Sequence, residues 1–516
     1  MTATRQPVRP AVSARGEVAS DGRRHRLLVG AVVLTVAAAI ALRLVSSGEL
    51  WLDESLSVQI ARKPLPQLFA ALRQDGAPPL YYLLLHGWMA VFGTGTYAVR
   101  ALSSVIGIVT LPLAYRTGKR LGGRQLAVPM LLLTATAPYA VRYSTETRMY
   151  ALVLALVLGG IPLLLDALNA PTRGRLLGVT LLTAALAYTH YWTLYLLGPV
   201  ALWLAWHRAW RVLAAMAASV IVFAPWLPSF LYQVVHTGTP WAEPPSLRII
   251  PTTLLQWGGP GQLGQLMALT MVPLAAVGLT ALPPRPGAQH LNIDPTGRPG
   301  MRALGALTLA PLIVAIGLGL VTNGGYSLRY TAVCLPFYLL LVARGTTVFP
   351  NRLPVRILGV LIVAGLIADV QLAFERRTQA DTISAAIRAS AAPGDVVAYC
   401  PDQLAPAVHR LLPARLGVKE LAYADPAGPA LVDWVDYGQR VRDLPPAAFA
   451  RQVLDAAGRG HQVWLVSQDG YRVWDETCSQ VTAVLTAVRG VPTIDVASTG
   501  SVYEHASLAR YPGSGG

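Results

Sequence analysis

The chain consists largely of apolar blocks of 16 to 22 residues, joined by short segments that are polar or rich in Pro and Gly. A helix needs about 20 such residues to cross a hydrocarbon core roughly 30 Å thick. Only 13% of the residues are charged and 53% are hydrophobic, whereas about 25% of the residues in a typical soluble domain are charged. The pattern therefore predicts a multi-span α-helical membrane protein.

Eleven blocks are predicted to be transmembrane helices, which together form a membrane domain over residues 27–373. They lie near residues 27–45, 97–115, 125–141, 150–168, 175–190, 191–207, 211–230, 263–282, 302–321, 328–348 and 356–373. The first block follows a polar, Arg-rich segment, residues 1–26. A secretory signal peptide is the alternative, but this block is longer than a usual signal core and has no convincing cleavage site. We therefore interpret it as a retained anchor.

The charges between the blocks predict an orientation. If residues 1–26 form a cytoplasmic tail, alternation of eleven spans places every strongly basic short loop on that side, as the positive-inside rule requires. These loops are residues 116–124, 173–175, 208–211, 285–302 and 344–356. Scattered Arg residues thus account for the net charge of +16, and we expect no nucleic-acid partner. Residues 79–92 are apolar, but a full crossing would break the alternation, so we expect a short helix at the outer membrane surface.

Composition also indicates where such a protein resides. Only 3 of the 42 basic residues are Lys, and Ala, Arg, Gly and Pro are abundant, which is typical of a GC-rich bacterial genome. We therefore expect a multi-pass protein of a bacterial plasma membrane.

Residues 374–516 differ from the rest of the chain because charged residues return after the last block. Gly394–Tyr399 and His461–Val466 are patterned like short buried strands that follow helical stretches, which predicts a small α/β domain. By the alternation, this domain lies outside the membrane on the extracytoplasmic side. Cys400 and Cys478 could pair there if the compartment is oxidising, although two residues do not prove a bridge.

Two adjacent acids, Asp53 and Glu54, lie in residues 46–96, the outer loop after the first span. Beside Trp51 at a membrane surface, they are equally well explained as helix-capping acids next to an interfacial aromatic residue. If they lie on a helix, their side chains point about 100° apart. One carboxylate is therefore expected to do chemistry while the other orients a neighbouring group.

Three further outer segments combine polar and aromatic residues. Residues 142–150 contain two Arg, one Glu and two Tyr, which would suit an anionic headgroup carrying a sugar, although a solvated turn is the simpler interpretation. Glu146 and Tyr150 share a face if this segment is helical. His190 lies in the next segment, where a lone His is more often a hydrogen-bonded interface residue than a ligand. The last segment is 325–330, and one topology brings all these clusters to the same membrane face.

These segments together resemble the GT-C membrane glycosyltransferases, and most closely the protein-O-mannosyltransferase superfamily and its bacterial relatives. The resemblance covers residues from about 27 to 373, and several motifs in the expected order make it specific at superfamily level. The motifs are Trp51–Glu54, Asp75–His86 followed by Phe92–Gly93, Tyr143–Tyr150, Thr189–Tyr191 and Arg329–Tyr330. Ala77 departs from the pattern because relatives often have His before the Pro-Pro pair, so the role of that His does not transfer.

The resemblance implies a GT-C fold and assigns roles to residues. An acid of the first outer loop, residues 46–96, is the catalytic base in that family; Asp53 matches this position and Glu54 completes the pair. The family uses polyprenyl-phosphate sugars, whose phosphate is bound by basic residues of later outer loops. Arg329 matches best, and Arg148, in the loop 142–149, is the second candidate. The further donor-binding candidates are Tyr330, Tyr150 and Tyr81, and the other site candidates are Glu146, His190 and His86.

A single carboxylate acting as base implies inversion at the anomeric carbon, whereas the sugar and the acceptor stay open. Mannose or arabinose are guesses from kinship, and the acceptor could be a glycan, a lipid or a protein. Some relatives require a divalent cation and others do not, so no cofactor is certain; Glu146 and His190 could be its ligands. The alternative function is a polytopic lipid or polysaccharide transporter or flippase. Such a protein is expected to show repeat symmetry or interrupted helices in matching halves, and we find neither.

Overall fold

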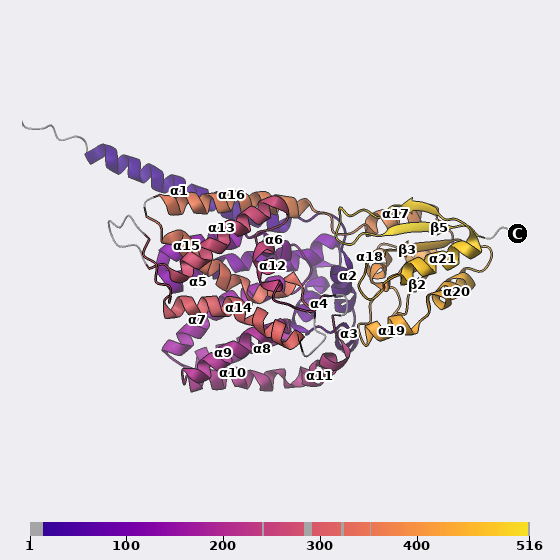
Figure 1. Cartoon of the computed structure of the whole chain (residues 1–516), viewed down its shortest axis with the longest axis horizontal. Helices are drawn as coiled ribbons and strands as arrows, with labels where there is room; N and C mark the ends of the chain where they lie inside the picture. Colours follow the sequence, from indigo (N-terminus) through magenta and orange to yellow (C-terminus); the bar gives the residue numbers. More distant parts are fainter. Residues whose placement is uncertain (1–13, 240–241, 283–290, 321–324, 351, 514–516) are drawn as a thin grey trace, which may run out of the picture.

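The structure is a computed structural model that describes residues 14–239, 242–282, 291–320, 325–350 and 352–513. Parts of the predicted cytoplasmic tail and of the basic loop 285–302 lie outside these residues. A helical bundle makes up most of the molecule, and a smaller domain with a β-sheet lies at one end of it (Figure 1). The multi-span helical part and the C-terminal α/β domain expected from the sequence are both present.

Seven helices among the described residues are long and apolar enough to cross a membrane. They are residues Arg26–Leu44 of α1 (Ala14–Leu44), α5 (Thr96–Ala135), α7 (Tyr150–Asn169), the run Trp210–His236 formed by α10 (Trp210–Phe223), η1 (Ala224–Trp226) and α11 (Leu227–His236), α13 (Gly261–Thr280), α14 (Pro299–Gly319) and α16 (Leu353–Phe374). Shorter helices occupy the other predicted spans or the predicted surface helix: α4 (Leu80–Phe92), α8 (Arg173–Thr189), α9 (Trp192–Trp206) and α15 (Leu335–Thr347). The multi-span architecture is confirmed, whereas the count of eleven stays a prediction.

Helix α5 contains two predicted spans because the chain reverses within it. Gly122 and Gly123 have non-helical dihedral angles, and the φ of Gly123 is 65°, in the left-handed region that favours glycine. A Cβ atom on Gly118 would lie 2.8 Å from the carbonyl oxygen of Leu126, although these residues would be about 12 Å apart along one straight helix. The two arms therefore form a hairpin, and the basic residues that link them lie in its turn.

The bundle has two ends with different residues. At the end away from the sheet domain, Arg120 donates a hydrogen bond of 2.9 Å to Asp166, and Arg175 donates one of 3.0 Å to the Asp166 carbonyl oxygen. At the other end, called the site end below, Arg43 of α1 donates to the carbonyl oxygens of Ala135 (2.7 Å) and Thr134 (2.9 Å). These contacts place the residues around 120, 166 and 175 at one end of the bundle and the last turn of α1 at the other. Which end faces the cytoplasm stays a prediction.

Short helices cover the site end. They are α2 (Leu52–Ala61), α3 (Leu65–Asp75), α6 (Pro138–Ser144), α12 (Ile249–Gln256) and η2 (Leu328–Val333), together with α4. Helix α4 is the short helix predicted for residues 79–92, and it packs against α2, α5 and α8. The span predicted to reach residue 141 is shorter in the structure. It ends at Ala135 because Pro138 begins the separate helix α6.

The C-terminal domain is built on a five-stranded sheet with the order β2-β1-β3-β5-β4. The strands are β1 (Val396–Cys400), β2 (Lys419–Ala422), β3 (Val463–Ser467), β4 (Thr493–Val496) and β5 (Ser507–Tyr511). β1, β2 and β3 are parallel, whereas β5 is antiparallel to β3 and β4. The two strands predicted from the sequence, β1 and β3, are neighbours in this sheet.

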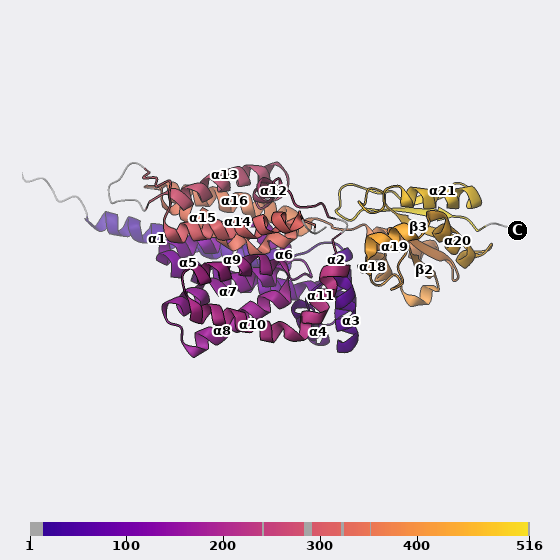
Figure 2. The ribbon, with the colours of Figure 1, turned by 60° about the horizontal axis from the view of Figure 1, so that its bottom comes forward.

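Helices cover both faces of the sheet, because alternate strand residues are buried on opposite sides. Ala398 of β1 belongs to one core, with residues of α20 and α21, and Tyr399 belongs to the other, with residues of α17 and α18. The helical elements of the domain are α17 (Ala380–Ser390), η3 (Asp402–Leu404), α18 (Ala405–His409), η4 (Ala414–Leu416), α19 (Tyr437–Asp443), α20 (Pro446–Ala457) and α21 (Thr477–Arg489). Figure 2 shows that the domain adjoins the end of the bundle that carries α2 and α3.

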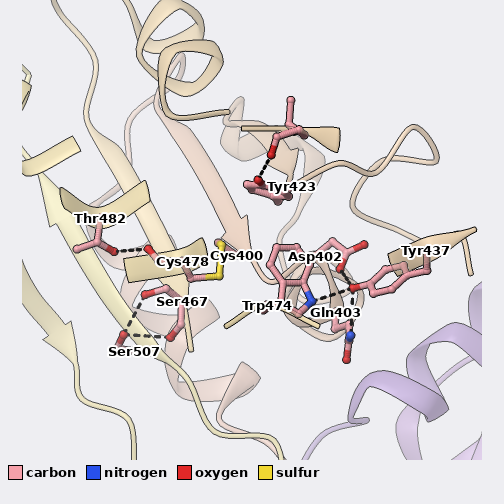
Figure 3. Close-up of a disulfide and its surroundings, with 11 residues drawn as sticks. Cys400, Asp402, Gln403, Tyr423, Tyr437, Ser467, Trp474, Cys478, Thr482 and Ser507 are labelled. Carbon is pink, nitrogen blue, oxygen red and sulfur yellow. Dashed lines mark hydrogen bonds between the residues drawn. A yellow bond between two sulfur atoms is a disulfide. The ribbon is translucent and has the colours of Figure 1, made fainter. Parts of the chain in front are cut away.

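A disulfide between Cys400 and Cys478 ties the end of β1 to α21 (Figure 3). The sequence left this pairing open. Beside the bridge, the Tyr437 hydroxyl donates to Asp402 and accepts a hydrogen bond of 3.2 Å from the Trp474 indole. Because a cross-link over 78 residues restricts the unfolded chain, it stabilises the domain.

The sheet domain rests on the site end of the bundle. Arg410 forms an ion pair of 3.4 Å with Glu49 and donates a hydrogen bond of 2.7 Å to the Thr94 carbonyl oxygen. The backbone N–H of Trp434 donates to the carbonyl oxygen of Gln74 at 3.3 Å. These contacts hold the domain against the link before α2, the end of α3 and the turn between α4 and α5.

Candidate active site

Helix α2 carries both adjacent acids in its first turn. It begins at Leu52, after Trp51, whose extended backbone (φ −83°, ψ 177°) ends the link from α1. The first N–H groups of a helix have no partner within the helix, and its dipole is positive at this end, so carboxylates are favoured here. The fold thus places Asp53 and Glu54 at a helix start on the site end.

The Asp53 carboxylate lies between two arginines. Nη1 of Arg329, on η2, is 2.9 Å from Oδ2 of Asp53, and Nε of Arg148 is 3.9 Å from the same oxygen. The Arg329 guanidinium also lies over the Trp51 ring, 5.6 Å from its centre. Asp53 and Arg329 are each only 8% exposed. The predicted base and both predicted phosphate ligands are therefore neighbours.

Arg148 also has hydrogen-bond partners other than Asp53. Its Nη1 donates hydrogen bonds of 3.1 Å to the hydroxyls of Ser57 and Tyr82. The Tyr82 hydroxyl donates in turn to Oδ2 of Asp75 at 3.1 Å. Burial raises the pKa of Asp75 to about 6, although the charge of Arg148 opposes this shift. Asp75 thus adds a second carboxyl group to the network around Arg148.

Tyr81 and His86, both on α4, lie outside the direct surroundings of Asp53. The Tyr81 hydroxyl is 2.8 Å from Ser103 Oγ, which donates to the carbonyl oxygen of Arg148 at 3.2 Å. Tyr81 is fully buried and supports the backbone of Arg148. Nδ1 of His86 is 2.7 Å from the carbonyl oxygen of Ala61 at the end of α2, so its contact is with the far end of that helix.

Glu54 is fully buried and surrounded by donors. Arg100 donates through Nε to Oε1 (2.8 Å) and through Nη2 to Oε2 (2.6 Å), and the Thr147 N–H donates to Oε1 (3.0 Å). Burial alone would raise the pKa of Glu54, but the charge and hydrogen bonds of Arg100 hold it well below its usual value. This carboxylate fixes α2 to α5 and to the loop before α7.

The Glu146 carboxylate faces two arginines. Its Oε2 is 3.5 Å from Nε of Arg142 and 3.8 Å from Nη1 of Arg377. Helix α6 ends at Ser144 and α7 begins at Tyr150, so the condition for a shared helical face of Glu146 and Tyr150 is not met. Burial raises the pKa of Glu146, although the two arginines oppose this.

An aromatic cluster adjoins Arg329. The His190 ring lies 5.7 Å from the ring of Tyr150 and 5.1 Å from that of Tyr330. The backbone N–H of Trp192 donates to Nδ1 of His190 at 3.1 Å, so Nδ1 is an acceptor. The Arg329 guanidinium is 5.9 Å from the centre of the Tyr330 ring. The segments around 150, 190 and 330 thus meet beside the ion pair of Asp53.

The residues at this site do not fit a divalent cation. In the described part of the chain, no group of three or more His, Cys, Asp and Glu side chains is placed to hold a metal ion. Glu146 faces Arg142 and Arg377, whereas His190 packs against tyrosines. Asp53 already lies between two guanidinium groups. No chemical step is therefore assigned to a metal.

Arg100 and Arg377 are the partners that the sequence interpretation missed. Arg100 lies inside the block predicted as span 97–115, and a charge in an apolar block is a signal because it needs a partner. Arg377 follows the last span and has no local signal. Its guanidinium donates to the carbonyl oxygen and hydroxyl of Thr145 (3.0 and 2.8 Å), 232 residues earlier.

Residues 76–232 match the family of dolichyl-phosphate-mannose-protein mannosyltransferases. The match runs from the turn before α4 into α11 and includes Arg148. The match covers less than half of the chain, so it is a likeness over this segment of the bundle. This likeness favours an enzyme over the transporter alternative. No curated protein matches the sequence.

The architecture is similar to that of ArnT from Cupriavidus metallidurans. The apo structure aligns with a TM-score of 0.58 and 13% identity, and the alignment covers 94% of this chain and 98% of ArnT. The structure of ArnT bound to undecaprenyl phosphate gives a TM-score of 0.57 and 13% identity over 93% of this chain and 98% of ArnT. At this identity the likeness shows a common fold, which extends through the C-terminal domain.

Proposed function

We propose that this protein is an inverting glycosyltransferase that moves a sugar from a polyprenyl-phosphate donor to an acceptor hydroxyl at the outer membrane face. The observation that carries the proposal is the Asp53 carboxylate, which lies between Arg329 and Arg148. In this proposal Asp53 is the general base, and the two arginines bind the phosphate. Glu54 is assigned to holding α2, because its oxygens are already bound by Arg100 and Thr147.

The proposed reaction needs few groups from the protein. The acceptor oxygen forms a bond to the anomeric carbon while the bond between that carbon and the phosphate oxygen breaks, and the bonding electrons leave with the phosphate. Two guanidinium groups stabilise this charge. An entering phosphate also offers Arg329 an alternative anionic partner, which frees Asp53 for the acceptor. Asp53 then takes the hydroxyl proton late in the step, when the attacking oxygen has become acidic.

The arrangement of the two acids supports inversion. A retaining reaction would need a carboxylate nucleophile beside the anomeric carbon in addition to the acid or base. Glu54 is fully buried and paired with Arg100, so it cannot share a substrate atom with Asp53. A single carboxylate acting as base delivers the acceptor to the face opposite the phosphate.

The donor and compartment are proposed from several features together. The match to ArnT, which was also solved with undecaprenyl phosphate, supports a polyprenyl carrier. The family description supports mannose, and arabinose is the second sugar to test. Acceptors from the lipid, glycan and protein classes all offer the required hydroxyl. Basic residues at the end opposite the site support a cytoplasmic far end and an extracytoplasmic site in a bacterial plasma membrane.

The test replaces Asp53 with Asn in the full chain. A positioned general base contributes about 10²- to 10⁴-fold to the rate, so we expect Asp53→Asn to lower sugar transfer in purified membranes by this factor. Binding of the polyprenyl-phosphate sugar should persist because Arg329 and Arg148 remain. Asp495→Asn, on strand β4 of the sheet domain, is the matched control and should transfer at the wild-type rate. Wild-type transfer by Asp53→Asn would overturn the assignment.

A further inference from the structure

A segment of the sheet domain reaches the helix that carries Asp53. Oε1 of Glu504 accepts a hydrogen bond of 3.0 Å from the Leu52 N–H, the first residue of α2. The neighbouring Tyr503 ring packs edge-on against Trp51, with 5.2 Å between ring centres. Glu504 is 452 residues away from Leu52 in the sequence. The start of α2 is therefore bounded by a distant part of the chain.

Backbone pairing fixes Glu504 in place. Thr378 and Glu504 form an isolated β-bridge, called the two-strand link below, in which the Glu504 N–H donates to the Arg377 carbonyl oxygen (2.8 Å) and the Gln379 N–H donates to the Glu504 carbonyl oxygen (3.1 Å). The side chain of Arg377 extends from the same link and lies 3.8 Å from Oε1 of Glu54. The two-strand link thus touches α2 at its first backbone N–H and at Glu54.

The contact from Glu504 supplies what the sequence around α2 lacks. The first N–H groups of a helix need an external acceptor, usually the side chain of the N-cap residue. The N-cap residue here is Trp51, whose indole only donates and makes no capping hydrogen bond. Glu504 provides the acceptor, and Asp53 is the next residue after the N–H that it binds.

We propose that Glu504 is a positioning residue for sugar transfer, through which the C-terminal domain sets the first turn of α2 and hence the Asp53 carboxylate. This inference rests on the proposed function, in which Asp53 is the base. It makes the sheet domain part of the catalytic assembly. Binding of the acceptor alone would not require this domain to contact the first turn of α2, which carries Asp53.

The chemistry of Glu504 suggests a conservative replacement. The residue is 5% exposed, and its Oε2 is buried without a hydrogen-bond partner. Burial raises the pKa of Glu504 to about 8, so the carboxyl is largely neutral at pH 7. A glutamine has the same length, is neutral and keeps a carbonyl oxygen for the Leu52 N–H. An alanine removes the acceptor altogether.

The first experiment compares Glu504→Ala with Glu504→Gln in the full chain, using a synthetic polyprenyl-phosphate sugar as donor. We expect Glu504→Ala to lower kcat by about 10- to 100-fold while the donor KM stays within about threefold, because Arg329 and Arg148 are not displaced. Glu504→Gln should keep at least about a third of the wild-type kcat. Equal losses in both variants would contradict the role of the acceptor oxygen.

A second pair of variants removes the donor of the same hydrogen bond. Leu52→Pro has no N–H, yet proline is favoured at the first helical position and the extended backbone of Trp51 suits a residue before proline. Leu52→Ala keeps the N–H and is the control for lost packing. We expect kcat of Leu52→Pro to be about tenfold below that of Leu52→Ala, and no further loss when Glu504→Ala is added. Additive losses would overturn the proposal.

Hydrogen exchange measures the contact without relying on activity. Exchange at the Leu52 amide should accelerate in Glu504→Ala and stay near the wild-type rate in Glu504→Gln. If Glu504→Ala does not fold, the two Leu52 variants decide. Wild-type kcat and exchange in Glu504→Ala, alongside an inactive Asp53→Asn, would overturn the positioning role alone. A fully active Asp53→Asn would instead overturn the proposed base.

Discussion

Asp53 and Glu54 are neighbours in the first turn of α2, yet their carboxylates have different surroundings. Asp53 is 8% exposed, with Arg329 at 2.9 Å and Arg148 at 3.9 Å, whereas Glu54 is fully buried and accepts three hydrogen bonds of 2.6 to 3.0 Å. The 100° between adjacent side chains on a helix directs one to a site and the other to the protein interior. A substrate phosphate can compete for the partners of Asp53, because Arg329 and Arg148 are donors that also suit a phosphate.

The largest effect is expected from removing the charge of Glu54. Breaking a buried ion pair by changing one partner costs about 3–5 kcal/mol because the other charge stays buried and unpaired. Glu54→Gln should therefore lower the unfolding temperature strongly, as measured by thermal unfolding of the detergent-solubilised protein. Arg100 is 2% exposed, so its charge would stay buried in this variant.

Asp53→Asn is the matched control for this stability measurement. The same change from acid to amide, one residue earlier, should lower the unfolding temperature by less than half as much, because Asp53 makes fewer short contacts. The rates should show the opposite ranking, measured at a temperature where both variants are folded. Equal losses of stability would mean that the two acids do not divide structure from chemistry.

The membrane helices could be predicted because hydropathy is a local property of the sequence. The block 356–373 corresponds to α16, Leu353–Phe374, and the two blocks within α5 are its two arms. The strands β1 and β3 were recognisable for the same reason. The helix break at Pro138 was missed because the apolar pattern continues past it, so hydropathy alone did not reveal the local backbone change.

The candidate site could be predicted as a meeting of outer segments but not as a set of pairs. Charge alternation indicated that Asp53, Arg148 and Arg329 share one end, and the structure brings them together. Pairing of Glu54 with Arg100 spans 46 residues, and that of Leu52 with Glu504 spans 452. Such pairs depend on how helices and the sheet domain pack, which no local pattern encodes.

Arg329→Lys tests the surroundings of Asp53, and its expected effect is of intermediate size. Lysine keeps the charge but loses the planar fork that binds a phosphate through two parallel hydrogen bonds. We expect kcat/KM for the donor to fall about 10- to 100-fold, a loss of about 1.4–2.7 kcal/mol of transition-state stabilisation. Steady-state transfer kinetics over a range of donor concentrations measure this loss.

Arg510→Lys, on strand β5 of the sheet domain, is the control for the same chemical change. Arg510 pairs with Asp495 within that domain, so donor kinetics should be unchanged. If Arg329→Lys also leaves kcat/KM unchanged, Arg329 is only a structural partner of Asp53. The two adjacent acids would then both belong to structural ion pairs, and the difference between them would disappear.

The smallest expected effect is a pH dependence, which distinguishes Glu54 from the network of Asp75, Tyr82 and Arg148. Because the pKa of Glu54 is lowered in the fold, the stability that this residue contributes is present above the ordinary pKa of a glutamate. It is lost only as the pH falls well below that ordinary pKa, so the contribution of Glu54 is constant between pH 5 and 8. Asp75 behaves differently because burial raises its pKa to about 6. Its network with Tyr82 and Arg148 therefore changes charge within that range.

Protonation of Asp75 removes the negative charge that faces Arg148, so the wild-type kcat/KM should fall about 3- to 10-fold as the pH is lowered through about 6. Asp75→Asn resembles the protonated state: at pH 7.5 its rate should equal that of the wild type at pH 5, and its profile should be flat between. Asp381→Asn, in the first turn of α17, should keep the wild-type profile. An Asp75→Asn profile that still falls at pH 6 would show that Asp75 is not the group that titrates.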